Sequence, residues 1–303
     1  MNRIALAALA ASIVALAGAA DAQQRRDFSK IEITATDLGH RTWMLQGEGG
    51  NMTAAVTDDG TILVDGEFAP LHDKIKAAIA ALSPQKVRYL VNTHFHGDHT
   101  GGNAGFAQEG ATVVAQVNVR NRLAAGTTNG LTGRKTPPAT AEALPAKTYT
   151  DAMMLVLKDR TVQLGHIANA HTDGDTYAYF PDADVLATGD IVTLGKRYPN
   201  IDFANGGGID GMIAGVDAYL KLVNDNTRIV PGHGPLVNKA KLAEYRAMLA
   251  DARERVAKLI AAGKSESEAV AAKPFADIQA SIGASDQASV NFVRVIYNSL
   301  KRG

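Results

Sequence analysis

The segment 93–103 brings together four side chains that could bind metal ions: His94, His96, Asp98 and His99. They include three of the chain's eight histidines, and the chain has no cysteine. Imidazole and carboxylate are the groups that Zn²⁺ accepts when thiolates are missing. In an extended segment, side chains two positions apart project to the same side, so His94 and His96 can bind one ion together. A turn after His96 lets Asp98 and His99 point toward a second ion.

Three further candidate ligands follow or join predicted strands. His171 lies in a turn between two strands, Asp190 comes at the end of a strand over 185–188, and His233 follows a strand over 228–230. Small residues come directly after His171 and His233. Ligands at strand ends can converge on one edge of a pair of stacked sheets, so we expect all seven side chains to meet there.

The elements that must position these residues are short apolar runs that alternate with helical patterns. Glycine, proline and Asp-Gly turns separate them, and a capping box at Ser265 and Glu268 marks a helix start. The segment 126–147 lacks periodicity and is predicted to be a long loop of the kind that often forms a lid or a binding edge. Predicted strands cover 41–45, 52–57, 61–65, 87–91, 111–115, 153–157, 161–164, 177–180, 185–188 and 228–230, and predicted helices cover 71–82, 118–125, 209–223 and much of the chain after 242.

This order of strands and helices favours a layered α/β domain with two sheets and helices outside. The His-x-His-x-Asp-His signature, the turn at His171, the Gly-Asp strand end at Asp190 and the Pro-Gly-His-Gly turn at His233 resemble the metallo-β-lactamase superfamily of zinc hydrolases. The resemblance covers residues 31–238. It implies a four-layer αββα sandwich of the α/β (α+β) class.

The resemblance also implies a ligand set and a reaction. His94, His96 and His171 would hold one Zn²⁺, Asp98, His99 and His233 a second, and Asp190 would bridge the two. A zinc ion lowers the pKa of its bound water toward ~7, so a hydroxide held between two ions can attack an acyl bond at neutral pH. Asp98 is expected to act as a catalytic residue that orients this hydroxide. No nucleophile-elbow motif is present, and none is needed for this chemistry.

The substrate class is less sharply indicated. Familiar β-lactamases of the superfamily have Cys or Ser where this chain has Asp190, and a bridging aspartate is typical of its thioester, lactone and phosphodiester branches. We expect an exported hydrolase that opens a β-lactam or lactone ring. The alternatives are a glyoxalase-II-like thioesterase and a non-catalytic zinc-binding protein. Because the same ligands accept iron, a redox-active di-iron site is a further alternative.

Some residues near the signature allow two interpretations. Asp65, at the end of a predicted strand, could support the metal loop or simply belong to a turn. Lys196 and Arg197 could bind a substrate carboxylate or form a solvated pair. Trp43 could belong to a flap over the site or to the core.

The chain's first residues predict export. Residues 1–22 combine a basic start, an apolar run over 4–18 and a small-x-small ending, as in a secretory signal peptide. The apolar run is shorter than the ~20 residues that cross a bilayer. We expect cleavage after Ala22, a metallo-β-lactamase-like domain over 23–238, and helices over 239–303 that pack on the same domain. The mature protein is then periplasmic or secreted, with no membrane association.

The composition restricts the partners. Lys and Arg together number 31, as do Asp and Glu, so the formal net charge is zero. Nucleic-acid binders usually carry a basic excess, so no nucleic-acid partner is expected. The absence of cysteine excludes disulfides and lipid attachment through cysteine. The expected partner is a small-molecule substrate.

Overall fold

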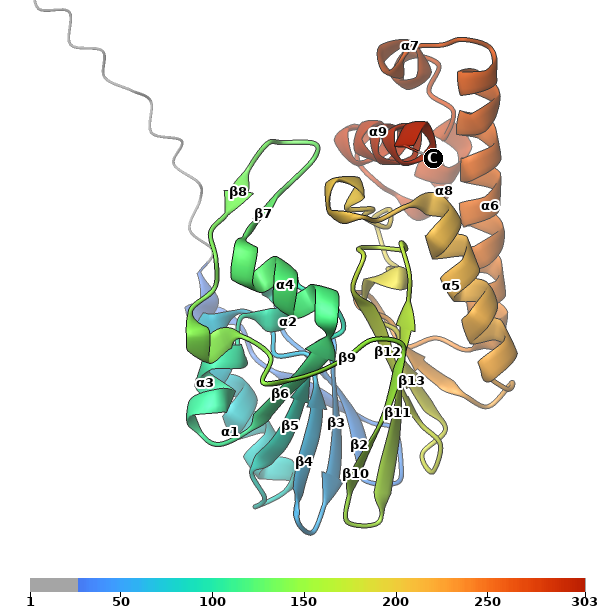
Figure 1. Cartoon of the computed structure of the whole chain (residues 1–303). Helices are drawn as coiled ribbons and strands as arrows, with labels where there is room; N and C mark the ends of the chain where they lie inside the picture. The colour runs from blue at the N-terminus through green and yellow to red at the C-terminus, as the bar shows by residue number, and fades with distance from the viewer. Residues whose placement is uncertain (1–26, 303) are drawn as a thin grey trace, which may run out of the picture.

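Two β-sheets stacked face to face form the centre of the structure, and helices cover their outer faces (Figure 1). The structure is a computed structural model that describes residues 27–302, so the predicted signal peptide lies outside the described residues. The first sheet has the strand order β1-β2-β3-β4-β5-β6-β9. Its strands are β1 (Thr34–Asp37), β2 (Thr42–Gln46), β3 (Met52–Thr57), β4 (Gly60–Val64), β5 (Val87–Val91), β6 (Thr112–Gln116) and β9 (Lys147–Tyr149).

The second sheet has the strand order β10-β11-β12-β13-β14. A separate hairpin pairs two short strands, and it follows helix α4 (Val117–Ala125) in the chain. The strands of the second sheet are β10 (Ala152–Leu157), β11 (Arg160–Ile167), β12 (Asp175–Phe180), β13 (Val185–Ala187) and β14 (Arg228–Val230), and those of the hairpin are β7 (Thr127–Thr128) and β8 (Lys135–Thr136).

The helices fall into an N-terminal and a C-terminal set. Among the described residues, no helix has both the length and the hydropathy that a membrane crossing requires. The α-helices are α1 (His72–Leu82), α2 (Gly97–Thr100), α3 (Asn103–Gln108), α4 (Val117–Ala125), α5 (Ile209–Leu222), α6 (Lys239–Ala261), α7 (Glu266–Ala271), α8 (Ala276–Ile282) and α9 (Asp286–Arg302), and the short 3₁₀ turns are η1 (Phe28–Lys30), η2 (Ala69–Leu71), η3 (Ala141–Ala143), η4 (Gly189–Ile191) and η5 (Phe203–Asn205).

The four layers follow from strands that are apolar on both faces. In β4, Ile62 and Val64 belong to the cluster between the sheets, whereas Leu63 faces outward and joins Ile75 of α1. Successive strand residues point to opposite faces, so a strand covered on both sides must be apolar throughout. The same holds for β13, in which Leu186 faces the α5 and α6 side. The fold expected from the sequence, a four-layer αββα sandwich, is confirmed.

The C-terminal helices pack against the segment that follows Asp190. The rings of Tyr198 and Phe292 of α9 stack, with centroids 4.6 Å apart. The hydroxyl of Tyr245 on α6 donates to the carbonyl of Ile191 at 3.1 Å. Residues on both sides of position 238 therefore contribute to one apolar cluster.

Most predicted elements lie within about two residues of the observed ones, and the capping box at Ser265 and Glu268 is confirmed. The strand predicted over 161–164 extends further at both ends, as β11. The segment 126–147, predicted to be a long loop, is mostly loop but also holds β7, β8, η3 and the first residue of β9, which the sequence did not indicate. The missed strands have two to four residues, too few for an alternating pattern to emerge.

We predict that Phe292→Ala lowers the free energy of unfolding by about 3–5 kcal/mol, because it removes a fully buried ring from a cluster that includes Tyr198. Gln287→Ala, at an exposed position of the same helix, is the control and should change stability by no more than about 0.5 kcal/mol. Denaturant unfolding followed by circular dichroism measures both. Equal midpoints for the two variants would contradict the packing of α9 described above.

Candidate metal centre

The predicted ligands meet at the edge where parallel strands of both sheets end. Strands β4, β5 and β6 are parallel neighbours, and so are β13 and β14. The carboxyl ends of parallel strands lie at the same edge of a sheet. His94 follows β5, Asp190 follows β13 and His233 follows β14, while His171 lies in the connection between β11 and β12.

Four side chains form a first group, defined as His94, His96, His171 and Asp190. Each offers one nitrogen or oxygen atom, and these atoms lie within 4.8 Å of one another. Within the group, Nδ1 of His96 and Nε2 of His171 are 2.9 Å apart. The rings of His94 and His171 are perpendicular, with centroids 4.6 Å apart.

Asp98, His99 and His233 form a second group with the same closeness of ligand atoms. Asp190 lies between the groups: its Oδ2 is 3.6 Å from His171 Nε2, and its Oδ1 is 3.2 Å from His99 Nε2 and 3.5 Å from His233 Nε2. One carboxylate therefore faces both groups. The structure brings all seven predicted side chains together, in the division that the family resemblance implied.

The orientation of His94 is determined by its outer nitrogen. The hydroxyl of Thr93 donates to Asp65 at 2.7 Å, so its oxygen accepts a hydrogen bond from Nδ1 of His94 at 3.0 Å. With the proton on Nδ1, the lone pair of Nε2 points inward. His99 has the same arrangement, since its Nδ1 donates to Asp65 at 2.8 Å.

His96 and His171 are held in the same way by other partners. Nε2 of His96 donates to Asp202 at 3.0 Å, and Nδ1 of His171 donates to the carbonyl of Asn200 at 2.8 Å. The two nitrogens that face each other across 2.9 Å are then both acceptors. Two lone pairs do not bond to each other, so this contact requires a shared proton or a metal ion.

The inward-facing atoms fit a metal ion. Among the described residues, Nε2 of His94 is buried and has no hydrogen-bond partner, while Nε2 of His99 and Oδ1 of Asp190 are buried 3.2 Å from each other without the geometry of a regular hydrogen bond. A buried polar atom without a partner costs free energy, and a native structure rarely leaves one without a reason. Neutral imidazoles whose outer nitrogens are hydrogen-bonded are the form that binds zinc. The donor set of nitrogens and carboxylate oxygens suits a divalent cation.

The electrostatics of the two groups differ. Burial lowers the pKa of His94 and of His171, which keeps both rings neutral. Burial would also lower the pKa of His99, but the carboxylates of Asp190, Asp65 and Asp98 outweigh it and raise that pKa well above its ordinary value. The second group is therefore surrounded by negative charge that attracts cations.

Two glycines allow the metal groups to pack this closely. A Cβ atom at Gly50 would lie 2.1 Å from the ring of His99, and one at Gly232 would lie 2.1 Å from Oδ1 of Asp190. Any larger residue would displace the ligand. The sequence showed these glycines only as turn formers, because their contacts are with residues far along the chain.

Glu67 is a site residue that sequence reasoning missed. Its side chain is fully buried, and both carboxylate oxygens accept from the backbone N–H of Gly49 at 2.8 Å. Burial raises the pKa of Glu67, against the effect of the Gly49 and Phe68 N–H groups. Glu67 thus fixes the β2–β3 loop, whose Gly49 lies against Asp98. A single glutamate outside any motif carries no signal of this role.

The ambiguous residues are also placed. Asp65 accepts from the N–H of Thr93 at 2.8 Å in addition to His99, so it supports the metal loop. Lys196 and Arg197 are exposed, and the aliphatic part of Lys196 lies near Gly283. Trp43 is half-buried against the cluster under α1.

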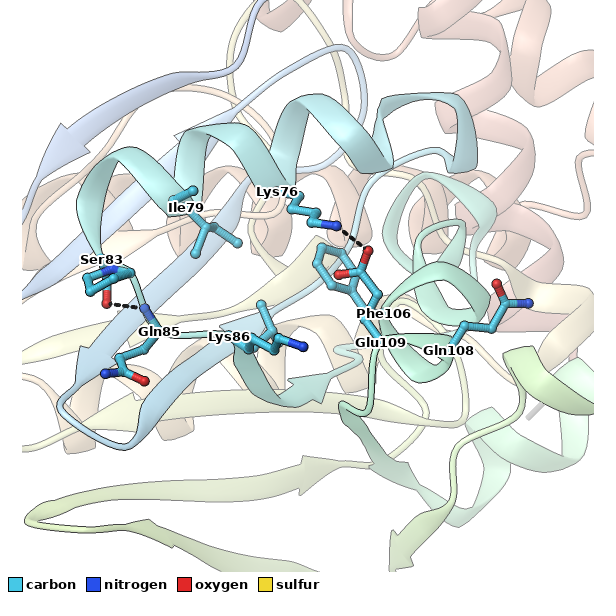
Figure 2. Close-up of a pocket in the computed structure, with 11 residues that line it drawn as sticks. Lys76, Ile79, Ser83, Gln85, Lys86, Phe106, Gln108 and Glu109 are labelled. Carbon is cyan, nitrogen blue, oxygen red and sulfur yellow. Dashed lines mark hydrogen bonds and ion pairs between the residues drawn. The ribbon is translucent and has the colours of Figure 1, made fainter.

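A separate cavity of about 360 Å³ lies between α1, the start of β5 and α3 (Figure 2). Phe106, Lys86 and the ion pair of Lys76 with Glu109 line it. None of the seven predicted ligands is among its lining residues, so it is distinct from the metal centre.

The sequence and the fold define the class of the protein. Residues 45–233, more than half of the chain, match the metallo-beta-lactamase superfamily, and the chain belongs to that superfamily. Most members are hydrolases or related enzymes, and the fold usually binds metal. This conclusion agrees with the signature around His94.

Two curated relatives resemble part of this chain in sequence. The linear primary-alkylsulfatase of a Pseudomonas species is 25% identical over 64% of this chain and 43% of its own length. The alpha subunit of the 2,4-dinitroanisole O-demethylase of a Nocardioides species is 27% identical over 55% of this chain and 48% of its own length. The match therefore spans less than half the length of these curated relatives.

Two solved structures share the fold at low sequence identity. A metallo-beta-lactamase from Pontibacter korlensis superposes with a TM-score of 0.61 at 16% identity, covering 73% of this chain and all (100%) of that one. The DIM-1 metallo-beta-lactamase superposes with a TM-score of 0.57 at 14% identity, covering 73% of this chain and 98% of that one. These likenesses support the sandwich architecture.

We predict that Asp65→Asn weakens zinc binding about 10- to 100-fold, because the amide keeps only one oxygen and its NH2 group would face the N–H of either Thr93 or His99. Competition with a chromogenic chelator measures the affinity. Asp217→Asn, which alters an aspartate of a half-exposed ion pair on α5, is the control and should bind zinc like the wild type. A folded Asp65→Asn protein with unchanged affinity would show that Asp65 does not support the ligands.

Proposed function

We propose that this chain is an exported two-zinc hydrolase that opens a strained or activated acyl bond, with a β-lactam or lactone ring as the favoured substrate. The observation that carries the proposal is the position of Asp190. Its two carboxylate oxygens face different ligand groups, at 3.6 Å from His171 and 3.2 Å from His99. This is the arrangement that two neighbouring cations sharing one carboxylate require.

The seven ligand residues would hold two metal ions. His94, His96 and His171 would hold one ion, Asp98, His99 and His233 the other, and Asp190 would contact both. Divalent ions bound there supply a water molecule that is deprotonated near neutral pH and polarise the bond under attack. The remaining chemistry belongs to the protein's own side chains.

Exposure indicates where a substrate approaches. The side chains of Asp98, His96 and His233 are 29%, 23% and 12% exposed, whereas those of His99 and His171 are inaccessible. A substrate therefore reaches the centre over Asp98. The Asp98 carboxylate can accept a hydrogen bond from the attacking water and orient it toward the substrate carbonyl.

Three observations bear on the substrate. The solved neighbours are β-lactamases, which favours a cyclic amide, whereas an aspartate at position 190 favours the lactone side of the proposal. The curated relatives are named as an alkylsulfatase and an O-demethylase. Both names refer to substrates with a group bound through oxygen, as in a lactone. A direct comparison of substrates is therefore the decisive experiment.

We predict that the purified, zinc-loaded protein turns over a chromogenic cephalosporin or an acyl lactone faster than an acyl-glutathione, an alkyl sulfate or 2,4-dinitroanisole. His96→Ala and Asp190→Ala should each abolish turnover and reduce bound metal while the fold is retained, because each removes a ligand. Initial rates across the panel, with circular dichroism of each variant, provide the test. Turnover of the thioester alone, or normal rates in either variant, would overturn this assignment.

Export is the second part of the proposal, and the pattern of residues 1–22 supports it. We predict that the protein expressed in a Gram-negative host accumulates in the periplasm with Gln23 as its first residue. Intact-mass measurement of the periplasmic fraction checks this. A cytoplasmic protein that retains Met1 would contradict export without affecting the metal-centre proposal.

A further inference from the structure

Asn205, the last residue of η5, uses both polar atoms of its side chain in hydrogen bonds. The residue is buried, and its Nδ2 donates to the Asp202 carboxylate at 2.8 and 2.9 Å and to the carbonyl of Thr128 in β7 at 3.2 Å. Its Oδ1 accepts from Arg122 of α4 at 3.3 Å. One buried amide therefore connects three separate segments of the chain.

The first of these segments leads to a predicted ligand. Asp202 is buried, and its Oδ2 accepts from Nε2 of His96 at 3.0 Å. That hydrogen bond directs Nδ1 of His96 toward His171. The backbone N–H of Asp202 also donates to the carbonyl of His171 at 2.9 Å. Asn205 thus holds the acceptor that orients His96.

The second segment is the β7–β8 hairpin, residues 127–136. Apart from its strand pairing, the hairpin contacts η5 at two places: the carbonyl of Thr128 accepts from Asn205, and Gly130 lies against the ring of Phe203. Figure 1 shows the hairpin projecting beyond α4 at the end of the molecule where the C-terminal helices lie. Most of its side chains are exposed, and Leu131 at its turn packs against the C-terminal apolar cluster.

The third segment is helix α4, which contributes Arg122. Arg122 donates to Asp173 through Nε at 3.1 Å and Nη2 at 2.6 Å, and Asp173 stands two residues after His171. Arg122 belongs to the helix that continues into the hairpin at Gly126. The base of the hairpin is therefore linked to both His96 and His171 through buried or half-buried polar contacts.

We propose that Asn205 is a positioning residue that orients His96 through Asp202 and at the same time fixes the β7–β8 hairpin against η5. The proposal rests on the proposed metal centre for its first half only. Loss of the Asn205 amide leaves Asp202 free to rotate away from His96 and releases the hairpin at Thr128.

The test is a double-mutant cycle on zinc affinity, with Zn²⁺ itself as the probe and a chelator as the competitor. Asn205→Ala should weaken zinc binding at the site of His94, His96 and His171 about tenfold, and it should have little further effect when Asp202→Ala is already present, because it acts through Asp202. Asn224→Ala is the matched control. It removes a similar Asn–Asp hydrogen bond, to Asp184 at 2.9 Å, at an exposed turn. We expect it to retain wild-type affinity.

Hydrogen exchange of the hairpin amides tests the second half without any metal. Asn205→Ala and the near-isosteric Asn205→Asp, which replaces the donors by acceptors, should both increase exchange over 127–136 at least severalfold. Wild-type zinc affinity in folded Asn205→Ala, or an equal loss in the Asp202→Ala background, would overturn the first half. Unchanged hairpin exchange in both variants would overturn the second. If the wild type binds no zinc, the proposed function fails, and the exchange result still decides the role of Asn205 in holding the hairpin.

Discussion

The structure depends on one constraint, which is the orientation of four histidine rings: His94, His96, His99 and His171. The outer nitrogen of each ring forms a hydrogen bond, so the inner nitrogens face one another and the carboxylate of Asp190. The outer partners are Thr93, Asp65, Asp202 and the carbonyl of Asn200. Such an arrangement is costly in a buried place unless a cation satisfies the inner atoms. The partners therefore make the ligand set a preorganised site.

The sandwich provides the rigidity that this arrangement needs. Parallel strands in both sheets end at the same edge, so residues from positions 65 to 233 are brought together by elements that are buried on both faces. The close approach of Gly50 to His99 and of Gly232 to Asp190 leaves no space for larger side chains. Tyr245 of α6 adds a contact next to Asp190 through the carbonyl of Ile191. Helix α6 thus contacts the segment that carries Asp190.

The sequence predicted the ligands better than their supports. His94 to His99 form a dense signature, and Asp190 and His233 follow strands with clear apolar patterns, so spacing and element order were sufficient. Glu67, Asp202 and Asn205 act through contacts with residues up to 106 positions away, as between His96 and Asp202. No local pattern distinguishes such residues from ordinary polar positions. The β7–β8 hairpin was missed because two-residue strands leave no periodicity.

The central claim, that the seven side chains bind two metal ions, is tested most directly by anomalous diffraction from crystals of the zinc-loaded protein. The account predicts two anomalous peaks per chain above the zinc absorption edge. One should lie among His94, His96 and His171, the other among Asp98, His99 and His233, with Asp190 in contact with both. Density without a peak at this edge of the sheets, or zinc bound only elsewhere, would contradict it.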